Sequence, residues 1–293
     1  MHSPVRLVAI DMDGTLLPTP AHAISARNAR AMRATQAAGI TLAIATGRRT
    51  DYAMPMLKSV GLRADTPMIT SNGAVLSTYT GETFECRTME ARVARGLCGL
   101  LRPFGTMVFT FDRTGRGALV YEDLSVPDEQ TNLWLEANRD ALQKVKPLEL
   151  ALSDGNDPIQ GMVAGNMAKM KRAMELFRAS EWATQCSCAL TENPSRDMAI
   201  MDLLPIGVTK GAGLERLAAR LGVDRKETMA IGDNWNDLDM LEWAGQSVLM
   251  ANAPTKLRAL ARTNGWKQTP PCDEDGVAVA LEAMLAKTNF LSA

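Results

Sequence analysis

The chain has 293 residues, of which 46% are hydrophobic, and its formal net charge is −1. This length and apolar content predict about two domains that each bury a sizeable core. Because acidic and basic residues are intermixed, no basic field is available for nucleic acid or an anionic membrane surface, and we expect neither partner. No apolar run reaches the ~20 residues of a membrane span, and the 5 cysteines form no Cys-x-x-Cys pair, so a reduced, cytoplasmic protein is expected.

The first part of the chain alternates strands with helices. Its predicted elements are strands at residues 5–10, 40–45 and 67–70 and helices at 25–38 and 51–60. Ser25 can cap the first helix, and Gly39 can end it. This alternation predicts a parallel sheet with helices on both faces, which is a doubly wound, Rossmann-like α/β core.

The pattern changes over the middle of the chain, residues 83–194. Strands are predicted there at 106–111, 118–121, 159–164 and 183–190, with helices at 90–101, 129–140 and 167–179. Strands that follow in pairs, with helices between the pairs, favour an α+β module with an antiparallel sheet.

The first pattern returns after residue 195. The predicted elements are strands at 199–203, 228–231 and 247–250 and helices at 211–221 and 237–243. We therefore predict one core domain formed by residues 1–82 and 195–293. An inserted α+β domain, residues 83–194, interrupts it.

Two polar motifs follow the first two predicted strands. Asp11-Met12-Asp13-Gly14-Thr15-Leu16 places two carboxylates directly after the first strand. Ligands of open α/β sheets bind outside the carboxyl ends of the strands, so both acids should meet the ligand. Ala45-Thr46-Gly47-Arg48 follows the second strand, and its hydroxyl and backbone N–H groups could hold phosphate oxygens.

Two further motifs complete the set. Thr209-Lys210-Gly211 places an ammonium group at the start of a helix, where the helix dipole also favours an anion. Gly232-Asp233-Asn234-Trp235-Asn236-Asp237 follows a predicted strand and supplies more oxygen ligands. The clustered carboxylates would repel one another without a cation, and an all-oxygen ligand set favours Mg²⁺.

The four motifs together resemble those of the haloacid dehalogenase superfamily, specifically its Cof-type phosphatases, whose cap domain is inserted between the second and third motifs. The resemblance extends to Ser71-Asn72-Gly73-Ala74 and to Glu274-Asp275-Gly276-Val277-Ala278. It covers essentially the whole core, whereas the cap matches in position and length more than in residues. Ile206, where a polar or basic residue is common, and Trp235, a bulky ring in the fourth motif, depart from the family pattern.

The resemblance implies a Mg²⁺-dependent phosphomonoester hydrolase that acts through an aspartyl-phosphate on a small cytoplasmic phosphometabolite, such as a sugar phosphate or a phosphorylated cofactor precursor. Asp11 would be the nucleophile and Asp13 the general acid and base. Mg²⁺ would be held by the Asp11 and Asp233 carboxylates and the main-chain carbonyl of Asp13. The groups expected to bind the transferring phosphoryl oxygens are the N–H groups of Met12 and Gly47, together with Thr46, Lys210 and Asn236. Asp237 would orient Lys210 or a metal-bound water, and for Asn72 a substrate contact and a simple turn are equally expected.

Two other functions stay open. A phosphomutase of the same superfamily would share every core residue and add cap cations for a second phosphate; the candidates are Arg87, Arg92, Arg95, Arg102, Arg113 and Arg116. A non-catalytic phosphometabolite sensor is disfavoured because both Asp11 and Asp13 are present. His2 and His22 lie outside the motifs, so histidine-based catalysis is not expected. The oligomeric state stays open.

Overall fold

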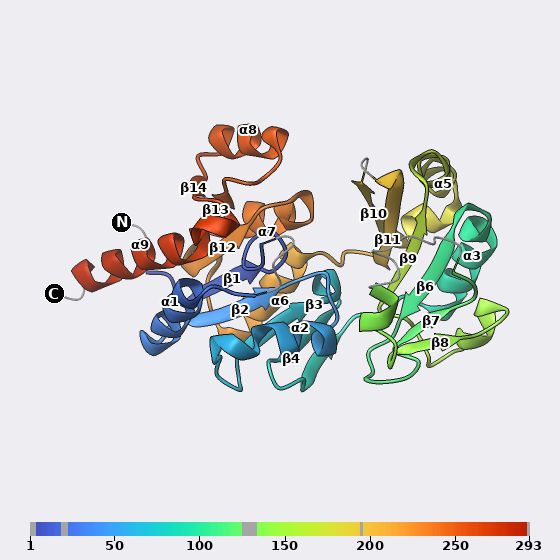
Figure 1. The fold of residues 1–293 in the computed structure, drawn as a ribbon, viewed down its shortest axis with the longest axis horizontal. Coiled ribbons are helices and arrows are strands. Elements are labelled where there is room, and N and C mark those ends of the chain that lie inside the picture. The colour runs from blue at the N-terminus through green and yellow to red at the C-terminus, as the bar shows by residue number, and fades with distance from the viewer. Residues whose placement is uncertain (1–3, 19–22, 125–133, 194–195, 292–293) are drawn as a thin grey trace. The chain divides into compact units, whose positions relative to one another are not determined.

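The computed structural model describes residues 4–18, 23–124, 134–193 and 196–291, and the chain divides into two compact units (Figure 1). Unit 1 consists of Met1–Glu85 and Thr209–Ala293, and unit 2 consists of Cys86–Val208. His2 and His22 lie outside the described residues. So does the first part of the helix predicted at 129–140, of which residues 134–137 are helical.

Unit 1 is built on an 8-stranded sheet in the order β14-β13-β12-β1-β2-β3-β4-β5. The strands from β14 to β3 are parallel, and β4 is antiparallel to β3. Their bounds are β1 (Leu7–Asp11), β2 (Thr41–Ala45), β3 (Pro67–Thr70), β4 (Val75–Thr78), β5 (Thr83–Cys86), β12 (Thr228–Gly232), β13 (Gln246–Met250) and β14 (Lys267–Thr269).

Helices cover both faces of this sheet because successive strand residues point to opposite sides. Val8 and Ile10 of β1 enter one apolar core, and Leu7 and Ala9 enter the other. The first core is closed by α1 (Ala26–Ala37), α2 (Thr50–Leu57) and α9 (Gly276–Leu291), and the second by α6 (Lys210–Leu221), α7 (Leu238–Trp243) and α8 (Thr255–Thr263). The prediction of a doubly wound α/β core is confirmed.

Unit 2 has a 6-stranded sheet in the order β10-β11-β9-β6-β7-β8, antiparallel except between β7 and β8. Its strands are β6 (Thr106–Thr110), β7 (Leu119–Tyr121), β8 (Leu142–Lys144), β9 (Gln160–Gly165), β10 (Cys186–Asn193) and β11 (Met198–Pro205). Helices α3 (Ala91–Leu101) and α5 (Met167–Ala179) share an apolar core with this sheet, in which Phe109 is fully buried. The inserted module is therefore an α+β fold, as predicted.

One predicted strand is placed differently. Residues 199–203 are predicted as a strand of the parallel core, but β11 lies in the sheet of unit 2, antiparallel to β9 and β10. The burial pattern gives the physical reason, because Ala199, Met201 and Leu203 are buried whereas Ile200 and Asp202 are partly exposed. Such alternation is typical of a half-buried antiparallel strand, and the apolar Ile200 conceals it in the sequence.

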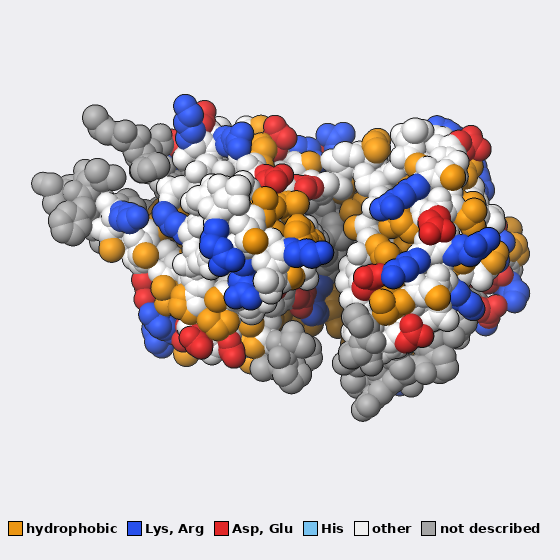
Figure 2. Space-filling view, turned by 90° about the horizontal axis from the view of Figure 1, so that it is seen from above, with side chains coloured by type: hydrophobic (Ala, Val, Ile, Leu, Met, Phe, Trp, Pro, Cys, Tyr) orange, Lys and Arg blue, Asp and Glu red, His pale blue; other side chains and the backbone are white. Residues whose placement is uncertain are grey.

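Charged side chains are dispersed over the surface. In Figure 2, lysine and arginine side chains on each unit are scattered among acidic, apolar and uncharged ones. Among the helices of the described ranges, none combines the length and the apolar character needed to cross a membrane.

Candidate active site

The carboxyl ends of three neighbouring strands assemble the candidate site. β1 lies between β12 and β2, and all three are parallel, so the residues that end or follow them meet at one edge of the sheet. Asp11 ends β1 with its side chain almost fully buried, Thr46 follows β2, and Asp233 follows β12. The chain turns sharply after β1, where the carbonyl of Met12 accepts the N–H groups of Leu16 and Leu17.

Lys210 connects two of these carboxylates. Its Nζ lies 2.6 Å from Asp11 Oδ1 and 2.6 Å from Asp237 Oδ1, and its side chain is 1% exposed. Lys210 is the first residue of α6, whose N-terminus is capped by the Thr209 side chain, an acceptor for the Ala212 N–H. Burial alone would lower the pKa of Lys210, but the two carboxylates outweigh it and hold this pKa above its ordinary value.

Two glycines let α6 approach the sheet. A Cβ at Gly211 would lie 2.6 Å from the Asp239 carbonyl carbon, and one at Gly213 would lie 2.6 Å from Ile69 Cγ2. No real side chain tolerates such distances. The position of α6, and with it that of Lys210, therefore depends on the absence of side chains at Gly211 and Gly213.

Both carboxylate oxygens of Asp237 accept hydrogen bonds. Oδ1 accepts from Lys210, and Oδ2 accepts the backbone N–H groups of Asp233 and Asn234, each at 3.0 Å. Asp237 thus fixes both the ammonium group of Lys210 and the loop that carries Asp233. Gly232 leaves the space for it, because a Cβ there would lie 2.7 Å from the Asp237 carboxylate.

Asp233 accepts hydrogen bonds from Thr15, which lies in the first motif, and from Asn252, which lies in none. Thr15 Oγ1 donates to Asp233 Oδ1 at 2.9 Å, and Asn252 Nδ2 donates to Oδ2 at 3.3 Å and to the Gly14 carbonyl at 2.8 Å. Gly14 has φ +82°, and a Cβ there would overlap the Asp233 carboxylate. Burial, followed by repulsion from Asp237, raises the pKa of Asp233 to about 6.

The three buried carboxylates carry more negative charge than Lys210 neutralises. One oxygen from each of Asp11, Asp233 and Asp237 lies within 4.8 Å of the others. Burial, with the neighbouring Asp237 adding to it, raises the pKa of Asp11 well above its ordinary value, against the opposing effect of Lys210. A buried cluster of hard oxygen ligands with one counter-charge for three acids fits a divalent cation such as Mg²⁺.

Asp13 has different surroundings, although it is only two residues from Asp11. Its side chain is 50% exposed and forms a bidentate ion pair with Arg48, from Nε to Oδ2 at 2.8 Å and from Nη2 to Oδ1 at 2.5 Å. The Arg48 guanidinium also lies over the Tyr52 ring, 5.1 Å from its centre. Arg48 is part of the second motif, but the sequence did not reveal this pairing, because it depends on the direction of a long side chain.

The second motif is held by the loop 71–73. Thr46 is fully buried; its N–H donates to the Ile69 carbonyl at 2.8 Å, and its carbonyl accepts the N–H of Asn72 at 3.1 Å. Ser71 and Asn72 have positive φ, 48° and 54°, a conformation that non-glycine residues adopt only where their surroundings impose it. A Cβ at Gly47 would lie 3.0 Å from Asn72 Oδ1, so the Asn72 amide faces the backbone of Gly47.

Asn236 and Trp235 lie at the exposed side of the fourth motif. Both belong to a short 3-10 helix, Trp235–Asp237, whose first N–H is capped by the Asn234 side chain. Asn236 is exposed, and the Trp235 ring is 47% exposed despite its size. The structure joins Asp11, Asp233, Asp237 and Lys210 in one contact network and leaves these two side chains facing solvent.

Comparison with known proteins agrees with this geometry. The family model for haloacid dehalogenase-like hydrolases matches residues 8–281. The 5-amino-6-(5-phospho-D-ribitylamino)uracil phosphatase YwtE of Bacillus subtilis is 30% identical over 96% of this chain and 99% of its own length. An HMP-PP phosphatase of Cronobacter sakazakii is 28% identical over 87% of both chains. A haloacid dehalogenase-like hydrolase from Bacteroides thetaiotaomicron has a similar fold, with a TM-score of 0.78 at 24% identity over 96% of this chain and 99% of that one.

The chain therefore belongs to the haloacid dehalogenase-like hydrolase family. Within that family it is a Cof-type phosphatase, as the four motifs predicted.

Proposed function

We propose that this phosphatase hydrolyses a small cytoplasmic phosphomonoester through an aspartyl-phosphate on Asp11, with Mg²⁺ as cofactor. The observation that carries the proposal is the contact of Asp11 with Lys210 inside a buried cluster of three carboxylates. Lys210 holds one Asp11 oxygen, so the carboxylate is fixed in orientation before substrate arrives. A carboxylate is already a competent nucleophile and needs no base to activate it.

Mg²⁺ would be held by Asp11, Asp233 and the carbonyl of Asp13, and it would supply positive charge to the phosphoryl oxygens. Lys210 and the backbone N–H groups of Met12 and Gly47 would bind those oxygens from the protein side, together with Thr46 and Asn236. Charge stabilisation and in-line positioning supply most of the catalysis in phosphoryl transfer. Asp237 acts through Lys210, because both of its oxygens are already engaged.

Asp13 would give a proton to the leaving oxygen and then take one from the water that hydrolyses the aspartyl-phosphate. In the structure both oxygens of Asp13 are paired with Arg48. For the first step, Asp13 must exchange Arg48 for a proton and the leaving oxygen. Because both side chains are partly exposed, this exchange needs no buried group to move.

The substrate is proposed to be a small phosphorylated metabolite, such as a sugar phosphate or a phosphorylated cofactor precursor. The names of the relatives YwtE and HMP-PP phosphatase support this class. Unit 2 would be the cap that selects the leaving group, since the core motifs contact only the phosphoryl group and the metal. A mutase stays the alternative, since four of the six cap arginines form exposed pairs within unit 2 that a second phosphate could replace: Arg92 with Glu90, Arg95 with Asp154, Arg102 with Glu122 and Glu149, and Arg113 with Asn156.

The test incubates the protein with a panel of phosphometabolites and Mg²⁺. For each compound, both the phosphate released and the isomerised substrate are measured. We expect phosphate release that stops in excess chelator and is nearly abolished in Asp11→Asn, whose fold should be intact because the change is isosteric. Asp140→Asn, at an exposed position in unit 2, is the matched control. Isomerisation would identify a mutase, and substantial turnover by Asp11→Asn would exclude the covalent mechanism.

A further inference from the structure

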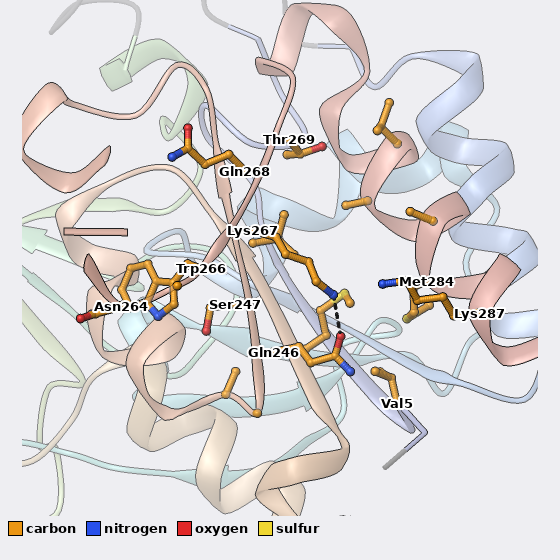
Figure 3. A pocket seen from close by; sticks show the side chains of 18 of the residues that line it. Val5, Gln246, Ser247, Asn264, Trp266, Lys267, Gln268, Thr269, Met284 and Lys287 are labelled. Atoms are coloured by element: carbon orange, nitrogen blue, oxygen red, sulfur yellow. Dashed lines mark hydrogen bonds between the residues drawn. The ribbon is translucent and has the colours of Figure 1, made fainter. Parts of the chain in front are cut away.

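A hollow lies in unit 1, at the edge of the sheet opposite to the candidate active site (Figure 3). Its volume is about 660 Å³. Val5 and Arg225, which precede β1 and β12, line it, and so do Gln246 and Lys267, which begin β13 and β14. Asp11 and Asp233 lie at the other ends of β1 and β12. Five parallel strand residues span roughly 16 Å, so a ligand in this hollow would not touch the catalytic carboxylates.

The walls of the hollow combine apolar and polar surface. Met229 and Val248 come from the sheet, and Val279 and Met284 come from α9. The Trp266 ring lies on the side away from α9 (Figure 3). The hollow has the volume for a small organic molecule, and its apolar surface from α9 and the sheet lies beside polar groups that could fix the orientation of that molecule.

Three of the four charged residues that line the hollow, as far as the structure describes it, are cationic. Lys267 and Lys287 point toward each other in Figure 3, and Lys267 Nζ donates to Gln246 Oε1 at 3.1 Å. The third cation, Arg225, donates to the backbone carbonyls of Glu242 and Trp243. These two acceptors are uncharged, so they do not neutralise the guanidinium group. Glu242 is the one acid among the described lining residues.

The ammonium groups of Lys267 and Lys287 repel each other unless a negative group lies between them. Burial, together with the neighbouring Lys287, lowers the pKa of Lys267. Within the described ranges, neither lysine forms an ion pair with an acid. Two converging ammonium groups beside a hydrogen-bonding amide are a ready site for a carboxylate, sulfonate or phosphate.

We propose that this hollow binds a small organic anion, with its acidic group between Lys267 and Lys287 and its apolar body against α9, Met229 and Val248. The site is a second ligand site of the core, separate from the catalytic carboxylates. It does not depend on the reaction proposed above.

The test uses anilinonaphthalene sulfonate as the probe, because it carries one acidic group on an apolar aromatic body. Titration of the full chain, followed by fluorescence and by calorimetry, should show one saturable site per chain. Since a hydrogen bond to a charged group contributes about 1.5–3 kcal/mol, the double variant Lys267→Met with Lys287→Met should weaken binding by about tenfold or more. Lys256→Met, an exposed lysine of α8 that does not line the hollow, should leave the dissociation constant unchanged.

A second variant tests whether the probe occupies the hollow, independently of the lysine charges. Ala283→Phe would fill the hollow from α9 without altering any charge, and it should also abolish saturable binding. Asp11→Asn should bind the probe as well as the natural chain does, because the catalytic site lies at the opposite edge. Unchanged affinity in the lysine double variant or in Ala283→Phe would overturn the proposal, as would loss of binding in Asp11→Asn.

Discussion

Two carboxylates of one motif, Asp11 and Asp13, lie in opposite environments. Asp11 is buried, and it and Asp237 both bind Lys210, whereas Asp13 is half exposed and pairs with the partly exposed Arg48. Burial makes the first pair strong and immobile, and exposure leaves the second weak and exchangeable. The difference matches the two tasks of the proposed reaction, since a nucleophile must stay in place and a proton carrier must change partners.

The largest expected loss of stability comes from removing Lys210, the cation that the two buried carboxylates share. Lys210→Met leaves Asp11 and Asp237 buried without their shared counter-charge, which should lower the free energy of unfolding by about 3–5 kcal/mol. Denaturant unfolding in chelator measures it, with the exposed Lys169→Met as control. Phosphate release should fall by similar factors for all substrates. A loss of stability below 1 kcal/mol, on the scale of an exposed pair, would remove the distinction between the two environments.

The second prediction concerns Asp233 and pH. Its pKa is raised from the ordinary 3.8 to about 6, so its contribution to stability is complete below about pH 4 and is lost as pH rises through 6. In metal-free protein at pH 8, Asp233→Asn should therefore raise the free energy of unfolding by roughly 2–3 kcal/mol, with little change at pH 4. Thermal unfolding at both pH values checks this. Stabilisation of equal size at the two pH values would show that the titration of Asp233 is not the cause.

Replacing Asn252, which binds the buried Asp233, should have a smaller effect on stability. Asn252→Ala removes its hydrogen bonds to Gly14, Asp233 and the Cys272 N–H, and should cost about 1–2 kcal/mol of stability. Because Asp233 then loses a donor that orients it, we also expect a higher Mg²⁺ concentration for half-maximal phosphate release. Titration of activity with Mg²⁺ measures the shift. An unchanged Mg²⁺ requirement would mean that Thr15 alone orients Asp233.

The smallest stability effect is expected on the exposed side. Arg48→Met should change the free energy of unfolding by less than about 1 kcal/mol, because the pair with Asp13 is partly solvated. Because Asp13 must leave Arg48 before it can protonate the leaving oxygen, Arg48→Met should not slow alkyl phosphates, the poorer leaving groups, more than aryl phosphates. The ratio of kcat/KM for the two substrate classes, compared with that of the natural chain, measures this. A larger loss on alkyl phosphates would show that Arg48 positions Asp13 as the acid.

The sequence predicts the fold where elements are long enough to show a period. Strands β1, β2, β3, β12 and β13 follow from apolar runs bounded by turn residues, and α1 follows from its cap, Ser25. Strands β4, β5, β8 and β14 were not predicted, because each has only 3 or 4 residues and at least half of them are polar. The strand at 199–203 was wrongly placed, since an apolar residue on an exposed face makes an antiparallel strand look fully buried.

The candidate site shows the same division. Asp11, Thr46, Lys210 and Asp233 are recognisable from sequence because each ends, follows or begins a predicted element. Arg48 and Thr15 lie in the first two motifs, but their contacts with Asp13 and Asp233 depend on side-chain directions that only the fold reveals. Asn252 lies in no motif and is 238 residues from the Gly14 carbonyl that it binds.

The glycines of α6 make the ammonium group of Lys210 sensitive to changes that never touch a substrate. A methyl group at Gly211 or Gly213 would push the helix away from the Asp239 backbone or from Ile69, and Lys210 would travel with it. An engineer who seeks a faster or broader enzyme should therefore randomise unit 2, the proposed cap, and keep this helix unchanged. In a library of random variants, losses at Gly211 and Gly213 would mimic active-site mutations although no group involved in the chemistry had been replaced.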